Sequence, residues 1–320
     1  MRRLFIVLST AFLPLSCCKE EPRTIEAVFL GTSPMTVVKS AGDDDLDISR
    51  LDLFVFRSAD GLLEARASAD SLSPLSVSLT RGRKMSWFMF ANAPEGYFPH
   101  VGSLDEFMRQ TVLLEDGPLM HAKGDTAFLD TGTTVKAMLK RYACKVGIRD
   151  ISIAWTDALP CRVTKAVLLN VQGSAPLSGE PADLELRYNC GVIDELGYPL
   201  DGMLEACPGV EITDSQPVQL DIRLSCMPNP SDGNSYGLPW QPRRTRVALC
   251  LNILGEDNWY PIDLPPMEGN CFYYVESIVI KGPGAAGADL PPERTSADFI
   301  IRVREWTESD TNVDFSTDNE

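Results

Sequence analysis

The sequence predicts an all-β protein of two tandem β-sandwiches, with one short helix in the first. Short apolar or alternating runs recur along the chain, and Gly, Pro, Asp and Ser separate them. Only one segment has the apolar spacing of a helix. At 320 residues, the chain also exceeds what one hydrophobic core usually fills. We therefore expect one sandwich over residues 18–157 and another over residues 158–320.

The first half contains short runs whose β-branched and aromatic residues predict strands. These runs are "TIEAVFL" (24–30), "RLDLFVF" (50–56), "LSVSLT" (75–80) and "MSWFMFAN" (85–92). Asp60 and Gly61 follow the second run. Both residue types tolerate positive φ, so this pair predicts a hairpin turn.

One helix is predicted between Gly102 and Leu114. The apolar residues with helical spacing are Leu104, Phe107, Met108 and Val112. Ser103 precedes them as the expected N-cap, and Glu106 stands at the third helical position. The pair predicts a capping box, in which each side chain accepts a backbone N–H.

The second half alternates again. Its expected strands are "TVKAMLKRYACKVGIRDISIAW" (134–155), "CRVTKAVLLNV" (161–171), "VQLDIRLSC" (218–226), "TRVALCLNIL" (245–254), "CFYYVESIVIKG" (271–282) and "ADFIIRVREW" (297–306). Residues 173–217 are rich in Gly, Pro and Asp and predict long loops. The domain boundary at residue 157 is placed after the strand that ends at Trp155.

The N-terminus has the pattern of a lipoprotein signal peptide over residues 1–17. Arg2 and Arg3 precede a mainly apolar run that is too short to cross a bilayer stably as a helix. Small Ser16 leads directly into two cysteines, as at a bacterial lipoprotein cleavage site. We expect lipidation of Cys18, with Cys17 as the alternative; three acyl chains, palmitate among them, would anchor the protein to a membrane almost irreversibly.

The composition excludes several partners. Loss of Arg2 and Arg3 with the signal changes the net charge from −16 to −18. A surface this acidic disfavours nucleic acid and anionic lipid as partners.

Seven cysteines follow the signal: Cys144, Cys161, Cys190, Cys207, Cys226, Cys250 and Cys271. Several are expected as buried hydrophobes on strands, with one or two disulfides among Cys190, Cys207 and Cys226 as the alternative.

No catalytic, cofactor or metal site is predicted. The cysteine spacings fit no zinc template, and GxSxG, HExxH and Walker motifs are absent from the sequence. His100 and His121 are both interpreted as surface residues beside loops. The acidic run "GDDDLD" (42–47) lacks the glycine and the distal glutamate of an EF-hand, and is interpreted as a solvated turn.

Several motifs occur in an order that resembles one protein family. "ISRLDLFVFRSADG" precedes "SVSLTRGRKMSWFMFANAP", the helix "SLDEFMRQ" and the strand "LKRYACKVGI". "NWYPIDLPPMEGNCFYYVESIVIKGPG" and "FIIRVREWTESDTNVDF" follow in the second half. Over residues 18–315 the chain resembles the Bacteroidetes fimbrillin superfamily, which includes fimbrial subunits and their anchor lipoproteins. Lys19, Glu20 and Glu21 resemble the family's acidic export signal, with a charged linker as the alternative.

The resemblance implies transthyretin-like sandwiches and polymerisation by strand exchange. Proteolysis removes the first strand, and a strand from a neighbouring subunit fills the vacated groove. The removable strand would be "TIEAVFL", with Ile25, Ala27 and Phe29 on one face; a permanent edge strand is the alternative. Family members are cleaved after an arginine that is missing here, and Lys39 occupies the corresponding position.

The C-terminal run is the candidate donating or pairing segment, with Ile301 and Val303 on one face. The alternative is a terminal strand held in its own sandwich.

The resemblance implies a non-enzymatic subunit of a surface fimbrium, anchored by lipid to the outer membrane. Its partners would be other fimbrial subunits and a host or bacterial surface receptor. We lean towards an anchor or accessory role over a bulk stalk role.

A second hypothesis is a surface lipoprotein whose sandwiches bind glycan or host protein. Tryptophans would then form stacking platforms. The candidates are Trp87, Trp155, Trp240, Trp259 and Trp306. Exposed coplanar tryptophans on one face would favour this hypothesis. A first strand inserted deeply between sheet edges would favour the fimbrial one.

Overall fold

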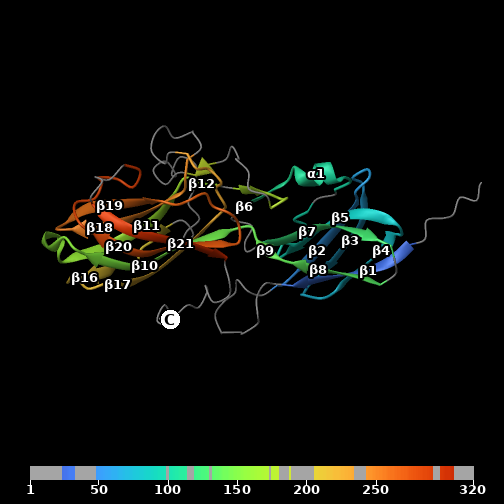
Figure 1. Cartoon of the computed structure of the whole chain (residues 1–320), viewed down its shortest axis with the longest axis horizontal. Helices are drawn as coiled ribbons and strands as arrows, with labels where there is room; N and C mark the ends of the chain where they lie inside the picture. Colours follow the sequence, from blue (N-terminus) through green and yellow to red (C-terminus); the bar gives the residue numbers. More distant parts are fainter. Residues whose placement is uncertain are drawn as a thin grey trace, which may run out of the picture.

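A computed structural model gives an all-β architecture (Figure 1). It describes residues 24–32, 48–98, 101–113, 119–129, 132–172, 174–179, 187–188, 205–233, 243–290 and 296–305. Within these ranges the only helical segments are α1 (Leu104–Met108) and a 3-10 turn at Thr156–Ala158. The strands divide into two groups that lie end to end, one from β1 to β9 and the other from β10 to β21 (Figure 1).

The first group forms two sheets. The smaller has the order β4-β1-β8 and the larger β3-β2-β5-β7-β9. Their strands are β1 (Thr24–Thr32), β2 (Leu51–Arg57), β3 (Leu63–Ala69), β4 (Leu75–Thr80), β5 (Arg83–Ala91), β7 (Met120–Phe128), β8 (Thr133–Met138) and β9 (Lys140–Arg141). Buried residues from both sheets, such as Leu79 and Val135 of the smaller and Leu53 and Met89 of the larger, form one core. The two sheets therefore pack face to face.

The larger sheet is also buried on its outer face. Six buried phenylalanines lie at this face and are called here the phenylalanine cluster. They are Phe54 and Phe56 of β2, Phe88 and Phe90 of β5, and Phe98 and Phe107, which follow β5 in sequence. Phe107, from α1, lies 5.0 Å from Phe54 and 5.2 Å from Phe56, measured between ring centroids. Burial on both faces explains why β2 is a nearly continuous apolar run instead of an alternating one.

Helix α1 confirms Ser103 as the N-cap, but Glu106 bonds the residue before the cap instead of closing the predicted capping box, and the helix is shorter than predicted. Ser103 accepts a hydrogen bond from the Glu106 backbone N–H at 3.3 Å, and Glu106 in turn accepts one from the Gly102 N–H at 3.2 Å. The helix ends at Met108, and Val112 lies in strand β6 (Thr111–Leu113). The predicted extension to Leu114 is wrong because the chain straightens there to pair with β13 (Ser174–Pro176).

The second group also forms two main sheets. One has the order β17-β10-β20-β21; the other has the order β15-β11-β18-β19, with β16 also paired to β11. The strands are β10 (Cys144–Ile153), β11 (Cys161–Leu169), β15 (Glu205–Ala206), β16 (Val210–Ile212), β17 (Val218–Cys226), β18 (Arg246–Ile253), β19 (Glu256–Asp263), β20 (Cys271–Ile280) and β21 (Ala297–Glu305). A two-stranded ribbon joins β12 (Val171–Gln172) and β14 (Arg187–Tyr188).

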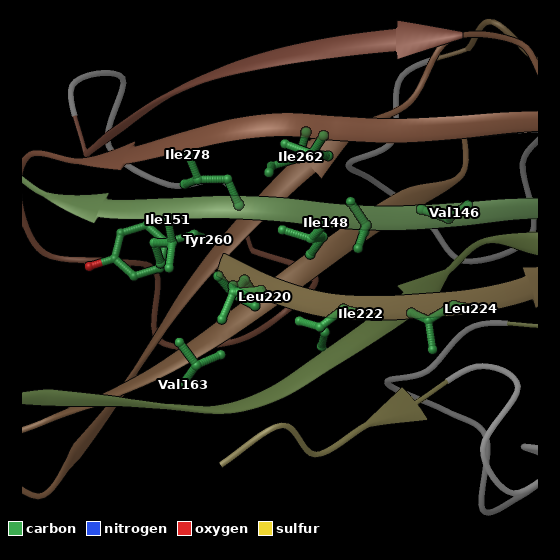
Figure 2. Packing of buried hydrophobic residues seen from close by; sticks show 14 of the residues in the cluster. Val146, Ile148, Ile151, Val163, Leu220, Ile222, Leu224, Tyr260, Ile262 and Ile278 are labelled. Carbon is green, nitrogen blue, oxygen red and sulfur yellow. The ribbon is translucent and has the colours of Figure 1, made fainter. Parts of the chain in front are cut away.

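One mainly aliphatic core lies between these sheets. Figure 2 labels core residues from both sheets, with Ile148 of β10 and Ile222 of β17 from one and Val163 of β11 and Ile262 of β19 from the other. Every second residue of β17 is buried, in agreement with the predicted alternation. The apolar face of each strand therefore turns inward, as expected for a β-sandwich.

The strand pairing corrects the expected division at residue 157. The predicted run 134–155 is three strands in three sheets, because β8 joins β1, β9 joins β7, and β10 joins β17 and β20. Sequence analysis had assigned all of this run to the first sandwich. Since β10 pairs with later strands, we propose that the division between the two units falls near residue 143.

The two groups of sheets contact each other directly. Strand β6 of the first pairs antiparallel with β13. The Tyr142 hydroxyl donates a hydrogen bond to the Leu177 carbonyl at 2.6 Å, and the Arg141 backbone N–H donates to the Asn270 side chain at 3.2 Å. Met227, which follows β17, packs into the phenylalanine cluster. We call this contact region the junction.

Candidate assembly site at the first strand

Strand β1 lies in the middle of its sheet. It pairs antiparallel with β4, where Ala27 opposes Val77, and parallel with β8, where Phe29 opposes Val135. The edge position that sequence analysis left open is therefore wrong. The strand is the first of those that the structure describes, yet strands that come later in sequence pair with it on both sides.

The side chains of β1 alternate as expected. Ile25, Ala27 and Phe29 are buried, whereas Val28 and Leu30 are half-buried on the other face. The Phe29 ring lies 5.8 Å from that of Trp87 and 6.0 Å from that of Phe128, between centroids. Fully burying a phenylalanine or isoleucine side chain contributes about 1.5–3 kcal/mol. These three residues therefore anchor the strand to the core.

The C-terminal end of β1 is closely fitted. Thr32 donates from its hydroxyl to the Ala137 carbonyl at 3.2 Å, and its own carbonyl accepts from the Leu139 N–H at 2.8 Å. A Cβ placed on Gly31 would lie 3.1 Å from the Met89 sulfur and 3.3 Å from Leu72 Cδ1. Sequence analysis missed Gly31, because its role depends on residues from other strands.

Removal of β1 would leave a slot between β4 and β8. Both neighbours would lose a hydrogen-bonding partner along one edge. The apolar residues that would border the slot are Leu75, Val77, Leu79, Val135 and Ala137. A strand with small and large apolar residues at alternate positions could fill this slot with the same pairing.

Most of the segment after β1 lies outside the described residues. Lys39 is among these residues, and the lipidation candidates Cys17 and Cys18, which precede β1, also lie outside the described residues.

Arg50 is the first arginine after the strand and precedes β2. Its side chain forms two ion pairs. Its guanidinium contacts Asp52 at 2.9 Å and Asp70 at 3.3 Å, and the hydrogen bond that it donates to Asp52 is the main reason that its pKa is raised.

Strand β21 forms an edge of the second group and pairs only with β20 among the described strands. Ile301 is half-buried against the core, but Val303 on the same face is 49% exposed. Phe299 and Ile300 are exposed by 43% and 52%. The terminal strand is thus held in its own sheet, its other backbone edge pairs with no described strand, and its exposed side chains are both apolar and charged, the latter including Asp298 and Arg302. Such an edge favours pairing with another strand.

Other sequence candidates do not combine into a site. Trp87 is buried, and Trp155 and Trp259 are partly buried against apolar clusters; Trp240 and Trp306 lie outside the described residues. His121 stacks on Tyr142 with 4.3 Å between ring centroids, beside a junction cavity of about 430 Å³. Within the described ranges, no group of three or more His, Cys, Asp or Glu side chains could hold a metal ion.

In the described part of the chain, no helix has the length and apolar character that a membrane span requires.

Comparison with known proteins gives similarity in structure only. No protein-family model matches the chain, and no curated protein matches its sequence. Fimbrilin FimA from Porphyromonas gingivalis is similar with a TM-score of 0.63 at 14% identity, over 88% of this chain and 97% of that one. A candidate cell adhesion protein from Parabacteroides distasonis has a TM-score of 0.62 at 14% identity, over 89% and 98%.

The tip fimbrial protein Mfa3 from Porphyromonas gingivalis, truncated at its C-terminus, is also similar. Its TM-score is 0.51 at 12% identity, over 87% of this chain and 99% of that one. The structural neighbours are thus fimbrial and cell adhesion proteins of Bacteroidetes, and the chain shares their all-β fold over most of its length.

Proposed function

We propose that this protein is a structural, non-enzymatic subunit of a cell-surface fimbrium, in the fimbrillin superfamily, that assembles by strand complementation. The position of β1 carries the proposal. It is the first strand in sequence, inserts between β4 and β8, and buries Ile25, Ala27 and Phe29. The shared fold of FimA and Mfa3 supports the same function.

The geometry of β1 suits replacement by another strand. Its contribution to the fold consists of main-chain pairing on two sides and one row of apolar side chains, which any chain with the same alternation can supply. The edge position of β21 and its exposed apolar side chains support a role as pairing segment, with Ile301 and Val303 as its candidate residues.

We further propose an anchor or accessory role, in the outer membrane, with other fimbrial subunits as partners and a host or bacterial receptor at the fimbrium's target. Residues 33–49 contain no arginine, and Lys39 is their only basic residue. Arg50 is held by two carboxylates. An arginine-directed protease therefore has poor access between β1 and β2, so β1 would remain in the fold. The lipid on Cys18 (or Cys17) would remain attached as long as Arg23, which lies between the lipidation candidates and β1, is not cleaved.

Limited proteolysis of the purified exported protein tests the role. An anchor is expected to keep strand β1 attached under a trypsin-like protease, which cleaves after lysine and arginine, and to be found at the base of purified fimbriae. A new N-terminus at Ser40, with oligomer ladders that resist SDS, would instead indicate cleavage at Lys39 and stalk behaviour. Lys39→Ala should abolish that cleavage, whereas the control Lys19→Ala should not. Absence from fimbriae would overturn the fimbrial proposal.

The glycan-binding alternative gains no support from the tryptophans. The three in the described residues contact apolar clusters and do not form a shared exposed platform. The fimbrial function is therefore the one that the geometry supports best.

A further inference from the structure

Three cysteines meet at the junction ends of neighbouring strands. Cys144 begins β10, Cys226 ends β17 and Cys271 begins β20. Strand β10 lies between the other two, so Cys144 is the central member of the group. Sequence spacing could not group them, because more than forty residues separate each from the next along the chain.

Cys144 and Cys226 oppose each other directly. They are register partners in the antiparallel pairing of β10 with β17. Their sulfur atoms lie 3.5 Å apart, and the Cys144 thiol contacts the Cys226 carbonyl oxygen at 3.3 Å. Both side chains are fully buried. The two thiols thus share one closed site between the sheets.

The backbone at this position suits a covalent bond. Directly opposed residues of antiparallel strands have Cα atoms about 4.5–5.5 Å apart, within the range of about 4.4–6.8 Å that disulfides adopt. Closing the distance between the sulfurs then requires side-chain rotation, with the strand pairing unchanged.

We propose that Cys144 and Cys226 form a disulfide in the exported protein and that this bond fastens the second group of sheets at the junction. Tyr142 precedes Cys144 by two residues and Met227 follows Cys226, and both pack into the phenylalanine cluster of the first group. The bond would therefore tie together the two chain segments that enter the junction from β10 and β17.

The oxidation needs an acceptor for two electrons, for which we assign a protein disulfide of the cell envelope. One cysteine thiolate attacks this disulfide, forms a mixed disulfide and expels one thiolate of the oxidant. The second cysteine thiolate attacks the mixed disulfide, forms the Cys144–Cys226 bond and expels the other thiolate. The two protons lost by the cysteines are taken up by the oxidant, which leaves as a dithiol.

The burial of Cys144 indicates when the disulfide forms. Burial is the main cause of the raised pKa of the Cys144 thiol, so little reactive thiolate exists once the sheets close. Oxidation therefore belongs to the folding stage, before β10 and β17 close around the pair. Half-buried Cys271 on the adjacent strand is the alternative bridging partner that a test must distinguish.

Two other buried cysteines provide controls. Cys161 opposes Ile253, and Cys250 opposes Lys165, in the pairing of β11 with β18. Neither has a cysteine as its register partner, so both are expected to remain thiols.

Peptide mapping of the full-length exported protein tests the bond without any mutation. Thiols are alkylated under denaturing conditions without reductant, and the protein is then digested with trypsin. Trypsin places Cys144 on residues 142–145 and Cys226 on residues 224–243. The expected product is these two peptides joined, and separated after reduction. Recovery of 142–145 as an alkylated thiol, or joined to 247–281 or 188–223, would overturn the proposal.

Thermal unfolding provides a second readout. Reductant should lower the midpoint for the wild type by on the order of 5–10 °C, since the bond closes a long loop. The double variant Cys144→Ala, Cys226→Ala should show no such shift, whereas Cys161→Ala should keep it. A wild-type midpoint that does not respond to reductant would contradict a stabilising bond. This outcome is independent of whether the protein assembles into fimbriae.

Discussion

At the scale of single residues, two aspartates have opposite electrostatic environments. Asp150 follows an irregularity in the β10–β17 pairing, and burial raises the pKa of its carboxyl despite Arg149 at 3.4 Å. Hydrogen bonds from Ser86 and Lys84 lower the pKa of Asp125 on β7. The folded state thus disfavours the charged form of Asp150 and favours that of Asp125.

We expect Asp150→Asn to stabilise the protein at neutral pH by less than about 1 kcal/mol. The folded state holds the Asp150 proton more tightly than the unfolded state. The ionised carboxylate therefore costs stability above its raised pKa, and this cost disappears below the unfolded pKa of about 4. Urea unfolding at pH 7 and at acid pH measures the difference.

Asp125→Asn is the control of opposite sign. The pKa of Asp125 is lowered in the folded state, so its ionised carboxylate stabilises the fold at any pH above the unfolded pKa. This contribution is lost as the pH falls through the folded pKa. This substitution should destabilise at neutral pH, and the loss should vanish in acid. Equal signs for the two variants would contradict the assigned environments.

Some residue roles could not be predicted from sequence. Gly31 is limited by Met89 and Leu72, which belong to a different strand and a loop. The Cys144–Cys226 pair depends on the register between strands far apart in the chain. Sequence analysis had named Cys226 but grouped it with Cys190 and Cys207, as cysteines expected in loops or at strand ends. Pairings between distant strands leave no local pattern that a single sequence reveals.

At the scale of elements, alternation predicted most strands well. The runs 218–226 and 75–80 coincide with β17 and β4, and the run 24–30 lies within β1.

Strand β7 was missed, because "MHAKGDTAF" lacks the β-branched content of a typical strand. Strand β19 was not among the predicted strands, and it contains Pro261. The proline is tolerated there since β19 is an edge strand.

The run 134–155 shows a different limit of pattern analysis. Its alternation is real, but the chain passes from the first group of sheets to the second within it. Alternation in the sequence indicates that a residue faces a hydrophobic core. It does not indicate which of the two cores the residue faces. The position of the division therefore required the strand pairing.

The anchoring of β1 gives a prediction at this scale. We expect Phe29→Ala to lower the free energy of unfolding by about 3–5 kcal/mol, because Phe29 is fully buried against Trp87 and Phe128. Leu30→Ala is the matched control on the half-buried face and should cost less than about 2 kcal/mol.

Denaturant unfolding followed by circular dichroism measures both losses. Similar losses for Phe29→Ala and Leu30→Ala would contradict the assignment of Ile25, Ala27 and Phe29 as the residues that anchor the strand.

At the scale of the whole molecule, two pairs of sheets meet at a junction built by the β6–β13 pair and by Tyr142 and Met227. Strand β1, which we propose is exchanged between subunits, lies in the first group, and the edge strand β21 lies in the second (Figure 1). A slot in one group and a pairing edge in the other would let identical or related subunits join head to tail.

The most direct measurement of the central claim is strand exchange at β1. A protease site inserted between Lys39 and Ser40 allows cleavage of the folded chain. A labelled peptide of residues 24–32 is then added in excess, beside a control peptide with Phe29→Glu. We expect the first peptide to displace the cleaved strand, to remain bound through SDS electrophoresis and to restore the stability of the uncleaved protein. Loss of residues 1–39 with no fall in stability and no peptide uptake would contradict assembly by strand complementation.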